Sequence, residues 1–301
     1  MAFLTADDLA KIFVLPIPGR MMASFYVGKE KQLSEIRKHL EKFSGGSVNL
    51  KKRGDGLAVI ELNQPEKKNA MSGKMMVDLH DAVEELHNWT EGKGVILKGK
   101  DGNFCSGGDL DFVRQISTPE EGFMMSTFMQ NTMNKFQRLP MISVALIEGI
   151  GGLGGGAELS VACDFRLMTE TCKGIGFVHL KMGILPAWGG TNRLVEKIGP
   201  TKALEVLSTA KIFSPTECLK LGLADDIVPR SDSPIDFALS WLGKRTQFDS
   251  NLIRSVKASV TSAKESPGDF ETERRTFAPF WGGPINKEAL LKNMKHKPEP
   301  S

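Results

Sequence analysis

The chain has 301 residues, of which 41% are hydrophobic and 25% charged, enough to bury a core in one large domain or two small ones. Its 39 basic and 36 acidic residues give a formal net charge of +3, too small an excess to indicate nucleic acid as the main partner. No apolar run approaches the roughly 20 residues that a membrane span needs, so we expect no membrane partner.

Residues 1–45 are predicted to form an N-terminal arm, partly disordered or helical, with one basic helical stretch over 29–42. Near the start, prolines interrupt the apolar piece 12–17 and acidic residues precede it, which fits neither a signal peptide nor a transit peptide. We therefore expect a protein of the cytoplasm, in the cytosol. The mitochondrion is the alternative, because basic residues follow in a region that contains methionine and serine.

A core over residues 46–233 is predicted to begin with a β-hairpin, since alternating runs at 47–52 and 57–63 flank a Gly-Asp-Gly turn. Ser72 can cap the helix that follows. Strands then alternate with helices, which argues for an α/β fold. The predicted strands are 94–98, 141–147 and 164–168, and the predicted helices are 72–89, 119–138 and 156–163.

Beyond residue 184 the chain reads as mostly helical, and residues 234–301 are predicted to be a C-terminal helical region. We expect this region to pack over the mouth of the core or against a neighbouring subunit. The predicted helices are 191–198, 201–209, 215–221, 234–246, 252–264, 270–281 and 287–295.

Two glycine turns lie about fifty residues apart, Phe104 to Leu110 and Glu148 to Leu159. Each follows a β-like run and precedes a helical stretch, so each can leave backbone N–H groups unpaired at a helix start. Two such turns facing one another would form an oxyanion hole, which stabilises anions derived from carbonyl groups. The pattern therefore favours enolate chemistry over binding alone.

Four segments, 63–72, 104–110, 154–164 and 186–191, resemble the enoyl-CoA hydratase/isomerase (crotonase) superfamily in order and spacing. The resemblance covers about residues 47–297. It implies a crotonase-like spiral of ββα units with a helical C-terminal region, assembled as a homotrimer or hexamer. It also implies an acyl-CoA thioester substrate, with coenzyme A as part of the substrate, no further cofactor and no metal.

By motif position, the resemblance assigns the oxyanion donors to the N–H groups of Gly108 and Gly155. The segment from residue 66 to 71 would cradle the adenine and pantetheine of CoA, with two lysines near the phosphates; a solvated lysine pair is the alternative. Trp188 would be a wall of the acyl pocket. The expected substrate-binding residues are Glu66, Lys67, Lys68, Ala70, Ser106, Gly107, Gly154 and Trp188.

Hydratases of this family use two glutamates around one water molecule. Glu158 occupies the first of these positions, but His179 occupies the second, counted back from Pro186. Decarboxylation of a 2-carboxyacyl-CoA needs only one proton, which either residue can deliver. The structural alternatives are a charge–dipole role for Glu158 at a helix start and a satisfied core histidine in a strand for His179.

A closer resemblance, carried by stretches such as 130–145 and 177–179, implies decarboxylation of ethylmalonyl-CoA to butyryl-CoA and CO2, with methylmalonyl-CoA as a poorer substrate, in metabolite repair. Two alternatives stay open. One is an enoyl-CoA hydratase/isomerase of fatty-acid oxidation. The other is a non-catalytic RNA-binding relative that uses the basic stretch 29–42.

The four cysteines lack metal-ligand spacing and are predicted to be reduced, buried thiols.

Overall fold

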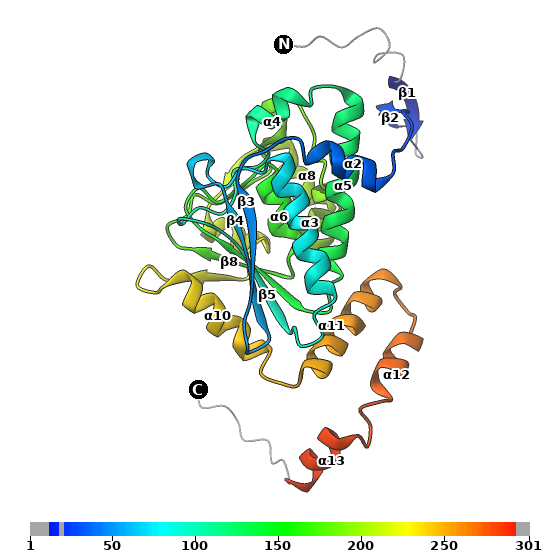
Figure 1. The fold of residues 1–301 in the computed structure, drawn as a ribbon, viewed down its shortest axis with the longest axis vertical. Coiled ribbons are helices and arrows are strands. Elements are labelled where there is room, and N and C mark those ends of the chain that lie inside the picture. Colours follow the sequence, from blue (N-terminus) through cyan, green and yellow to red (C-terminus); the bar gives the residue numbers. More distant parts are fainter. Residues whose placement is uncertain (1–11, 18–20, 293–301) are drawn as a thin grey trace.

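The computed structural model describes residues 12–17 and 21–292. Within them, the main sheet has six strands in the order β11-β8-β6-β5-β4-β3 (Figure 1). β3 and β4 are antiparallel, whereas all other neighbours run parallel and are connected through helices. The bounds are β3 Ser47–Lys52, β4 Leu57–Asn63, β5 Gly94–Gly99, β6 Ile142–Ile147, β8 Phe165–Thr169 and β11 Asp226–Val228.

The β3–β4 hairpin confirms the prediction to the residue. Asp55 in its turn accepts hydrogen bonds from the Arg53 guanidinium and from the Leu57 N–H. Gly56 has a positive φ of 82°, which favours glycine there. Buried and half-buried positions alternate from residue 58 to the end of β4, as expected for a strand that turns one face to the core.

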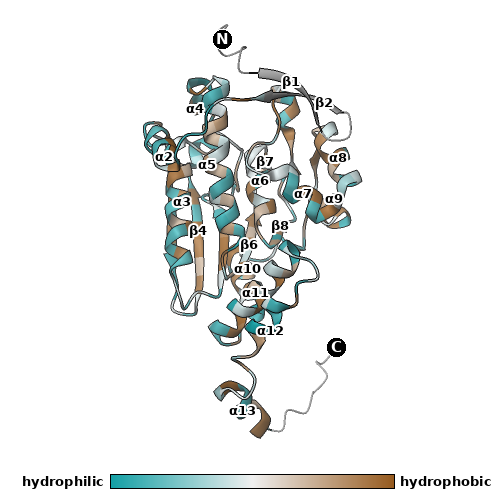
Figure 2. Ribbon diagram, turned by 90° about the vertical axis from the view of Figure 1, so that its right-hand side faces the viewer, coloured by the Kyte–Doolittle hydropathy of each residue, from teal (hydrophilic) through white to brown (hydrophobic). Residues whose placement is uncertain are grey.

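One face of the main sheet is covered by helices that form the larger hydrophobic core (Figures 1 and 2). Ser72 caps α3 as predicted, since its hydroxyl accepts the Met75 N–H at 3.1 Å. The helices of this part are α3 Gly73–His87, α4 Leu110–Gln115, α5 Pro119–Gln137, α6 Gly155–Ala162, α7 Gly190–Ile198, α8 Pro200–Thr209 and α9 Pro215–Leu221. The helical stretch expected after the first glycine turn corresponds to α4, for which no bounds had been predicted. The other six helices had been predicted within two residues at each end.

The opposite face of the sheet is covered by α10 (Pro234–Arg245), whose Trp241 and Leu242 join a second buried cluster with Ile96 and Val144. The start of the helical C-terminal region thus packs on the sheet. α11 (Ser250–Glu265) follows, and its Lys257 pairs with Asp164 of the core.

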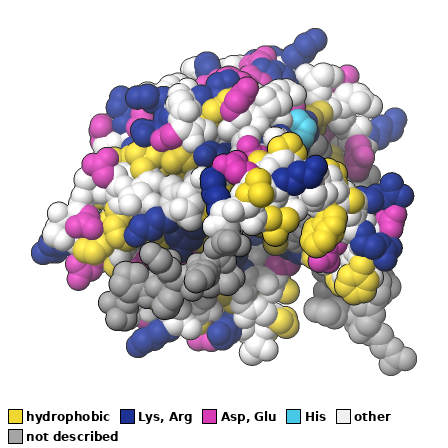
Figure 3. Space-filling view, turned by 90° about the horizontal axis from the view of Figure 1, so that it is seen from below, with side chains coloured by type: hydrophobic (Ala, Val, Ile, Leu, Met, Phe, Trp, Pro, Cys, Tyr) yellow, Lys and Arg dark blue, Asp and Glu magenta, His cyan; other side chains and the backbone are white. Residues whose placement is uncertain are grey.

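α12 (Glu271–Phe277) and α13 (Pro284–Leu291) extend from the lower end of the molecule (Figure 1). Seen from below, hydrophobic surface lies between charged side chains there (Figure 3), and Trp281 and Leu291 are strongly exposed. α12 is shorter than the helix predicted over 270–281. The helix predicted over 287–295 begins earlier, and its last three residues lie outside the described residues.

The N-terminal arm contains two strands that were not expected. β1 (Ile12–Ile17) and β2 (Met21–Tyr26) pair antiparallel, and Pro16, which has no N–H, obscures the strand pattern in β1. α2 (Leu33–Leu40) lies within the predicted basic stretch, and its Ile36 and Leu40 are buried in the main core. The division into an arm, a core and a C-terminal region stays a prediction.

A small sheet, also unexpected, lies beside the glycine turns. Its two-residue strands β7 (Gly152–Leu153), β9 (Ile175–Gly176) and β10 (Ile212–Phe213) follow the order β10-β9-β7. An isolated bridge joins Cys105 to Gly152 and so ties the first glycine turn to the second. In the part of the chain that the structure describes, no helix is both long enough and apolar enough to span a membrane.

Candidate active site

A pocket of about 570 Å³ opens beside the two glycine turns. Its lining includes every residue that the sequence analysis assigned to the site: Glu66, Lys67, Lys68, Ala70, Ser106, Gly107, Gly108, Gly154, Gly155, Glu158, His179 and Trp188. Apolar side chains that the sequence analysis had not assigned complete the lining, among them Met125, Val178 and Leu185. The structure thus brings the predicted residues together; their roles in catalysis stay predictions.

The two turns lie in direct contact. The Leu153 N–H donates to the Cys105 carbonyl at 3.0 Å. A Cβ on Gly107 would lie 3.0 Å from the Leu153 carbonyl oxygen and 3.5 Å from the Gly155 nitrogen, and its φ of 110° also favours glycine. A Cβ on Gly156 would lie only 2.2 Å from the Cys105 carbonyl oxygen. These glycines therefore let two backbone segments approach more closely than side chains would permit.

Each turn presents one unoccupied donor to the pocket. Met71 donates to the Gly107 carbonyl at 2.8 Å and accepts from the Asp109 N–H at 2.9 Å, which leaves the Gly108 N–H between them. Gly155 begins α6, so its N–H has no acceptor within the helix. Among the described residues, neither N–H donates to a protein acceptor. Both glycines line the pocket, so two N–H groups without a protein acceptor belong to residues of one lining.

Glu158 is buried at the back of this pocket and ties three segments together. Its Oε2 accepts the N–H groups of Trp188 and Gly190, each at 2.8 Å. Its Oε1 accepts the Ala187 N–H at 3.2 Å and lies 3.1 Å from the His179 Nε2. The carboxylate thus holds the loop before α7, a role beyond the charge–dipole interaction that its place in the first turn of α6 had indicated.

His179 lies in a 3₁₀ segment, Val178–Met182, and not in a strand as its structural alternative had supposed. The side chain is 7% exposed, and its Nε2 faces Glu158. Its other ring nitrogen, Nδ1, is buried and has no hydrogen-bond partner within the described chain. His179 is therefore not a core histidine with all its hydrogen bonds satisfied, because Nδ1 has no partner and the residue belongs to the pocket lining.

Trp188 forms one wall, at the place that the sequence analysis expected. Its ring lies over Gly155, where a Cβ would be 2.4 Å from the nearest ring carbon. The indole N–H donates to the Met125 sulfur at 2.9 Å. The Trp188 carbonyl accepts from the guanidinium of Arg193 at 2.7 Å. The backbone of Trp188 is thus held on both sides, by Glu158 and by Arg193.

Arg193, on α7, is a residue of this site that the sequence analysis did not assign. It is buried, and its guanidinium also donates to Asn134 at 2.6 Å and to Gln137 at 3.1 Å on α5. Burial lowers the pKa of Arg193, and the nearby Glu158 offsets part of that effect. The position of Arg193 five residues after Trp188 is the sequence feature that places it near the site. That position does not indicate that its partners come from α5.

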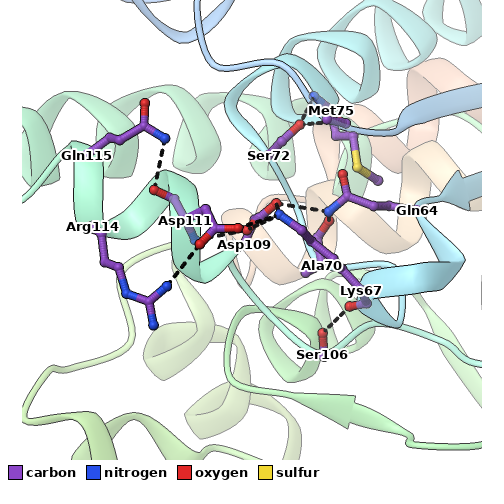
Figure 4. Close-up of polar contacts among 11 residues, drawn as sticks. Gln64, Lys67, Ala70, Ser72, Met75, Ser106, Asp109, Asp111, Arg114 and Gln115 are labelled. Carbon is purple, nitrogen blue, oxygen red and sulfur yellow. Dashed lines mark hydrogen bonds and ion pairs between the residues drawn. The ribbon is translucent and has the colours of Figure 1, made fainter.

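Lys67 joins the CoA-binding segment expected from the family resemblance to the first glycine turn (Figure 4). Its ammonium lies 2.8 Å from Asp109 and 2.8 Å from Asp111, and these bonds raise its pKa to about 12. The Lys67 charge is therefore balanced by two carboxylates in the unliganded chain, and its expected place near the phosphates of CoA stays a prediction. Lys68, which has a left-handed φ of 53°, carries the other charge of the predicted pair.

Asp109 caps α4, since its carboxylate accepts the Asp111 N–H at 2.9 Å. Gln64 also donates to it, at 3.0 Å (Figure 4). Burial raises the pKa of Asp109, but the hydrogen bonds from Lys67, Asp111 and Gln64 together outweigh burial and leave the pKa lowered. An ionised Asp109 thus fixes the turn that carries Gly108.

Two further groups bear on the chemistry. Burial raises the pKa of Cys105 to about 12, so this thiol, although next to the first turn, is not a thiolate nucleophile near neutral pH. In the described residues, no group of three or more His, Cys, Asp or Glu side chains is placed to hold a metal ion. The chemistry we derive below uses the backbone donors, Glu158 and His179.

Comparison with known proteins gives a consistent result. The family described as Enoyl-CoA hydratase/isomerase matches residues 52–281. Two similar curated proteins are both named ethylmalonyl-CoA decarboxylase. The protein from Mus musculus is 49% identical over 266 residues, covering 87% of this chain and 82% of the relative. The protein from Homo sapiens is 46% identical over 265 residues, covering 87% and 86%.

Solved structures share the fold. An enoyl-CoA hydratase from Bacillus anthracis superposes with a TM-score of 0.75 at 25% identity, covering 81% of this chain and 95% of that one. A protein described as a putative enoyl-CoA hydratase from Thermobifida fusca, solved in complex with CoA, has a TM-score of 0.68 at 23% identity and covers 88% and 99%. The predicted fold class, α/β and crotonase-like with a helical C-terminal region, is confirmed.

Proposed function

The chain belongs to the enoyl-CoA hydratase/isomerase family, and we propose that within it this protein decarboxylates ethylmalonyl-CoA to butyryl-CoA and CO2, with methylmalonyl-CoA as a poorer substrate. The names of the similar curated proteins support the substrate. The observation that carries the reaction is geometric: two backbone N–H groups without a protein acceptor line one pocket together with the buried Glu158, whose carboxylate lies 3.1 Å from the His179 Nε2.

The reaction needs a place for negative charge. As the bond between the α-carbon and the carboxylate breaks, its electron pair moves toward the thioester carbonyl and forms an enolate. The N–H groups of Gly108 and Gly155 would donate to the enolate oxygen. Removing one such donor typically raises the barrier by about 3 kcal/mol, so the pair accounts for a substantial part of the catalysis.

The walls of the pocket favour loss of CO2. Trp188, Met125 and Val178 present apolar surface to it. A substrate carboxylate that loses its water to this apolar surface is destabilised relative to neutral CO2. This promotes cleavage of the C–C bond when the carboxylate lies out of the enolate plane. The α-carbon then takes up one proton, for which Glu158 and His179 are the candidates.

The same geometry disfavours hydration. Hydration needs two acid/base groups placed around one water molecule, and here His179 occupies the position of the second carboxylate. Three other carboxylates belong to the lining: Asp109 and Asp111 are paired with Lys67, and Glu66 is exposed. An isomerase needs only one carboxylate, so the pocket is also compatible with isomerase activity. The non-catalytic RNA-binding relative belongs to another functional class. The experiments below distinguish both alternatives from decarboxylation.

We further propose that the protein acts in metabolite repair, in the cytosol, as a homotrimer or hexamer, with no cofactor beyond the CoA of its substrate. The repair role follows from the substrate, which a carboxylase acting on butyryl-CoA by mistake would produce. Size-exclusion chromatography with light scattering tests the assembly. An RNA-binding assay at two salt concentrations tests the non-catalytic alternative, because phosphate contacts weaken as salt rises.

A panel of acyl-CoA and carboxyacyl-CoA thioesters, followed by mass spectrometry, tests the function. We expect loss of CO2 from ethylmalonyl-CoA and, more slowly, from methylmalonyl-CoA. Rapid hydration of crotonyl-CoA with both carboxyacyl thioesters unchanged would favour the hydratase. A shift of the double bond in 3-enoyl-CoA, again without CO2 release, would favour the isomerase.

A further inference from the structure

Glu158 uses both carboxylate oxygens as acceptors. Oε2 accepts two backbone N–H groups, from Trp188 and Gly190, while Oε1 accepts the Ala187 N–H and faces the His179 Nε2. The side chain is 1% exposed. A proton on Oε2 would displace one of its two N–H donors, and a buried N–H that loses its acceptor is costly. Glu158 is therefore suited to hold its neighbours and not to exchange a proton with a substrate.

His179 has the complementary property. We assign the hydrogen of this contact to Nε2, with the Glu158 carboxylate as its acceptor. The proton of Nδ1 is then the one that can be exchanged. Nδ1 has no protein partner in the described chain, although the ring is buried and lines the pocket. Nδ1 itself has almost no exposed surface in the unliganded chain, so a substrate bound in the pocket becomes its partner once the ring turns Nδ1 toward it.

On the basis of the decarboxylation proposed above, we propose that His179 is the catalytic acid and Glu158 its positioning residue. When the C–C bond breaks, its electron pair enters the thioester enolate and CO2 leaves. The α-carbon then takes the proton from Nδ1 of the imidazolium, and the neutral ring regains a proton from water. Glu158 keeps the Nε2–H oriented, and the same carboxylate holds the Trp188 wall.

This assignment predicts a second measurable reaction. By microscopic reversibility, the neutral His179 ring can take a proton from the α-carbon of butyryl-CoA and return a deuteron when the solvent is D2O. The exchange forms the same enolate but involves no CO2. It therefore reports on the acid independently of decarboxylation.

The matched variants are His179→Gln and His80→Gln. In His179→Gln, the amide nitrogen of the introduced side chain can replace Nε2 opposite Glu158, but nothing replaces Nδ1. His80 is a second buried histidine, 3.1 Å from Thr132 and outside the pocket lining, so its variant controls for loss of an imidazole. His179→Asn is the second test variant if His179→Gln does not fold, and thermal unfolding decides which is used.

We expect wild type and His80→Gln to place one deuteron stereospecifically at C2 of butyryl-CoA formed from ethylmalonyl-CoA in D2O. His179→Gln should lower kcat and the exchange rate about 100-fold or more, with KM within about threefold, and scramble the residual deuterium. Wild-type exchange and stereospecificity in His179→Gln would overturn the assignment.

Glu158→Gln separates the two roles. If Glu158 only positions His179, Glu158→Gln should turn over more slowly. Its product should still be stereospecifically labelled, because His179 still delivers the proton. Scrambled label in Glu158→Gln together with specific label in His179→Gln would make Glu158 the acid and overturn the proposal. If wild type exchanges the α-proton through His179 but releases no CO2, the proposed decarboxylation fails while the assignment of the acid is supported.

Discussion

The ring of Trp188 lies over Gly155 with no room for a side chain between them, since a Cβ on Gly155 would be 2.4 Å from the ring. The wall of the pocket and one proposed oxyanion donor are therefore a single packed unit. Glu158 fixes the wall from one side and Arg193 from the other. A change at any of these residues should move the wall relative to the donor.

Gly155→Ala tests this contact. Gly155 does not have a positive φ, so the backbone accepts alanine, but the new methyl group must displace the Trp188 ring or the N–H beside it. We expect kcat/KM for ethylmalonyl-CoA to fall about 100-fold, and overpacking against the ring to lower the stability by about 1–3 kcal/mol. Gly243→Ala, in the last turn of α10 with open space at its Cβ, is the control and should keep full activity. Full activity of Gly155→Ala would show that the donor is misplaced.

Arg193→Met should destabilise the protein by about 3 kcal/mol, because the Trp188 carbonyl and the side-chain oxygens of Asn134 and Gln137 would each lose a buried donor. Urea unfolding followed by circular dichroism measures the change. Arg193→Lys keeps the charge but cannot reach all three acceptors, so an intermediate value is expected. Equal stability of all three proteins would contradict the role given to Arg193.

Lys67→Met tests the ion pair that fixes the first turn. Because the pKa of Asp109 is lowered in the folded protein, the pair stabilises fully above the unfolded-state pKa of aspartate, about 3.9, and the gain is lost as pH falls through the folded-state value. We expect a lower Tm for the variant at pH 7 and a gap that closes below about pH 4.

The control for that series is Lys74→Met, which removes an exposed pair with Asp78 on α3 and should change the Tm very little. A gap between Lys67→Met and wild type that stays constant from pH 7 to pH 3 would show that the Asp109 charge is not what the lysine stabilises.

Ser72→Ala removes the N-cap of α3 and should cost about 1 kcal/mol, because the Met75 N–H loses its acceptor. Ser233 is the matched control, since it precedes α10 but makes no side-chain cap bond there. Chemical unfolding of Ser233→Ala should show a smaller loss. A loss of equal size in both variants would contradict the contribution of the Ser72 hydroxyl.

Sequence patterns predicted the fold where periodicity was strong. The β3–β4 hairpin and α3 followed from alternation and from a capping serine. The two-residue strands β7 and β9 were missed because they are too short to show a period, and β1 was hidden by Pro16. α12 proved shorter than predicted.

The predicted site residues did converge on one pocket, but their partners could not be predicted. The bond of Lys67 to Asp109 spans 42 residues and that of Arg193 to Gln137 spans 56, distances over which no local pattern carries information. The hydrogen bonds to both Glu158 oxygens and the unpartnered Nδ1 of His179 likewise could not be predicted. They depend on the loop before α7, which contacts α6 only in the folded chain.

The most direct test of the central claim is one incubation of the wild-type protein with ethylmalonyl-CoA, labelled with ¹³C in the free carboxylate, in D2O. Decarboxylation through His179 predicts release of labelled CO2 and formation of butyryl-CoA that carries one deuterium at C2. Unchanged ethylmalonyl-CoA, with rapid hydration of crotonyl-CoA by the same preparation, would contradict it.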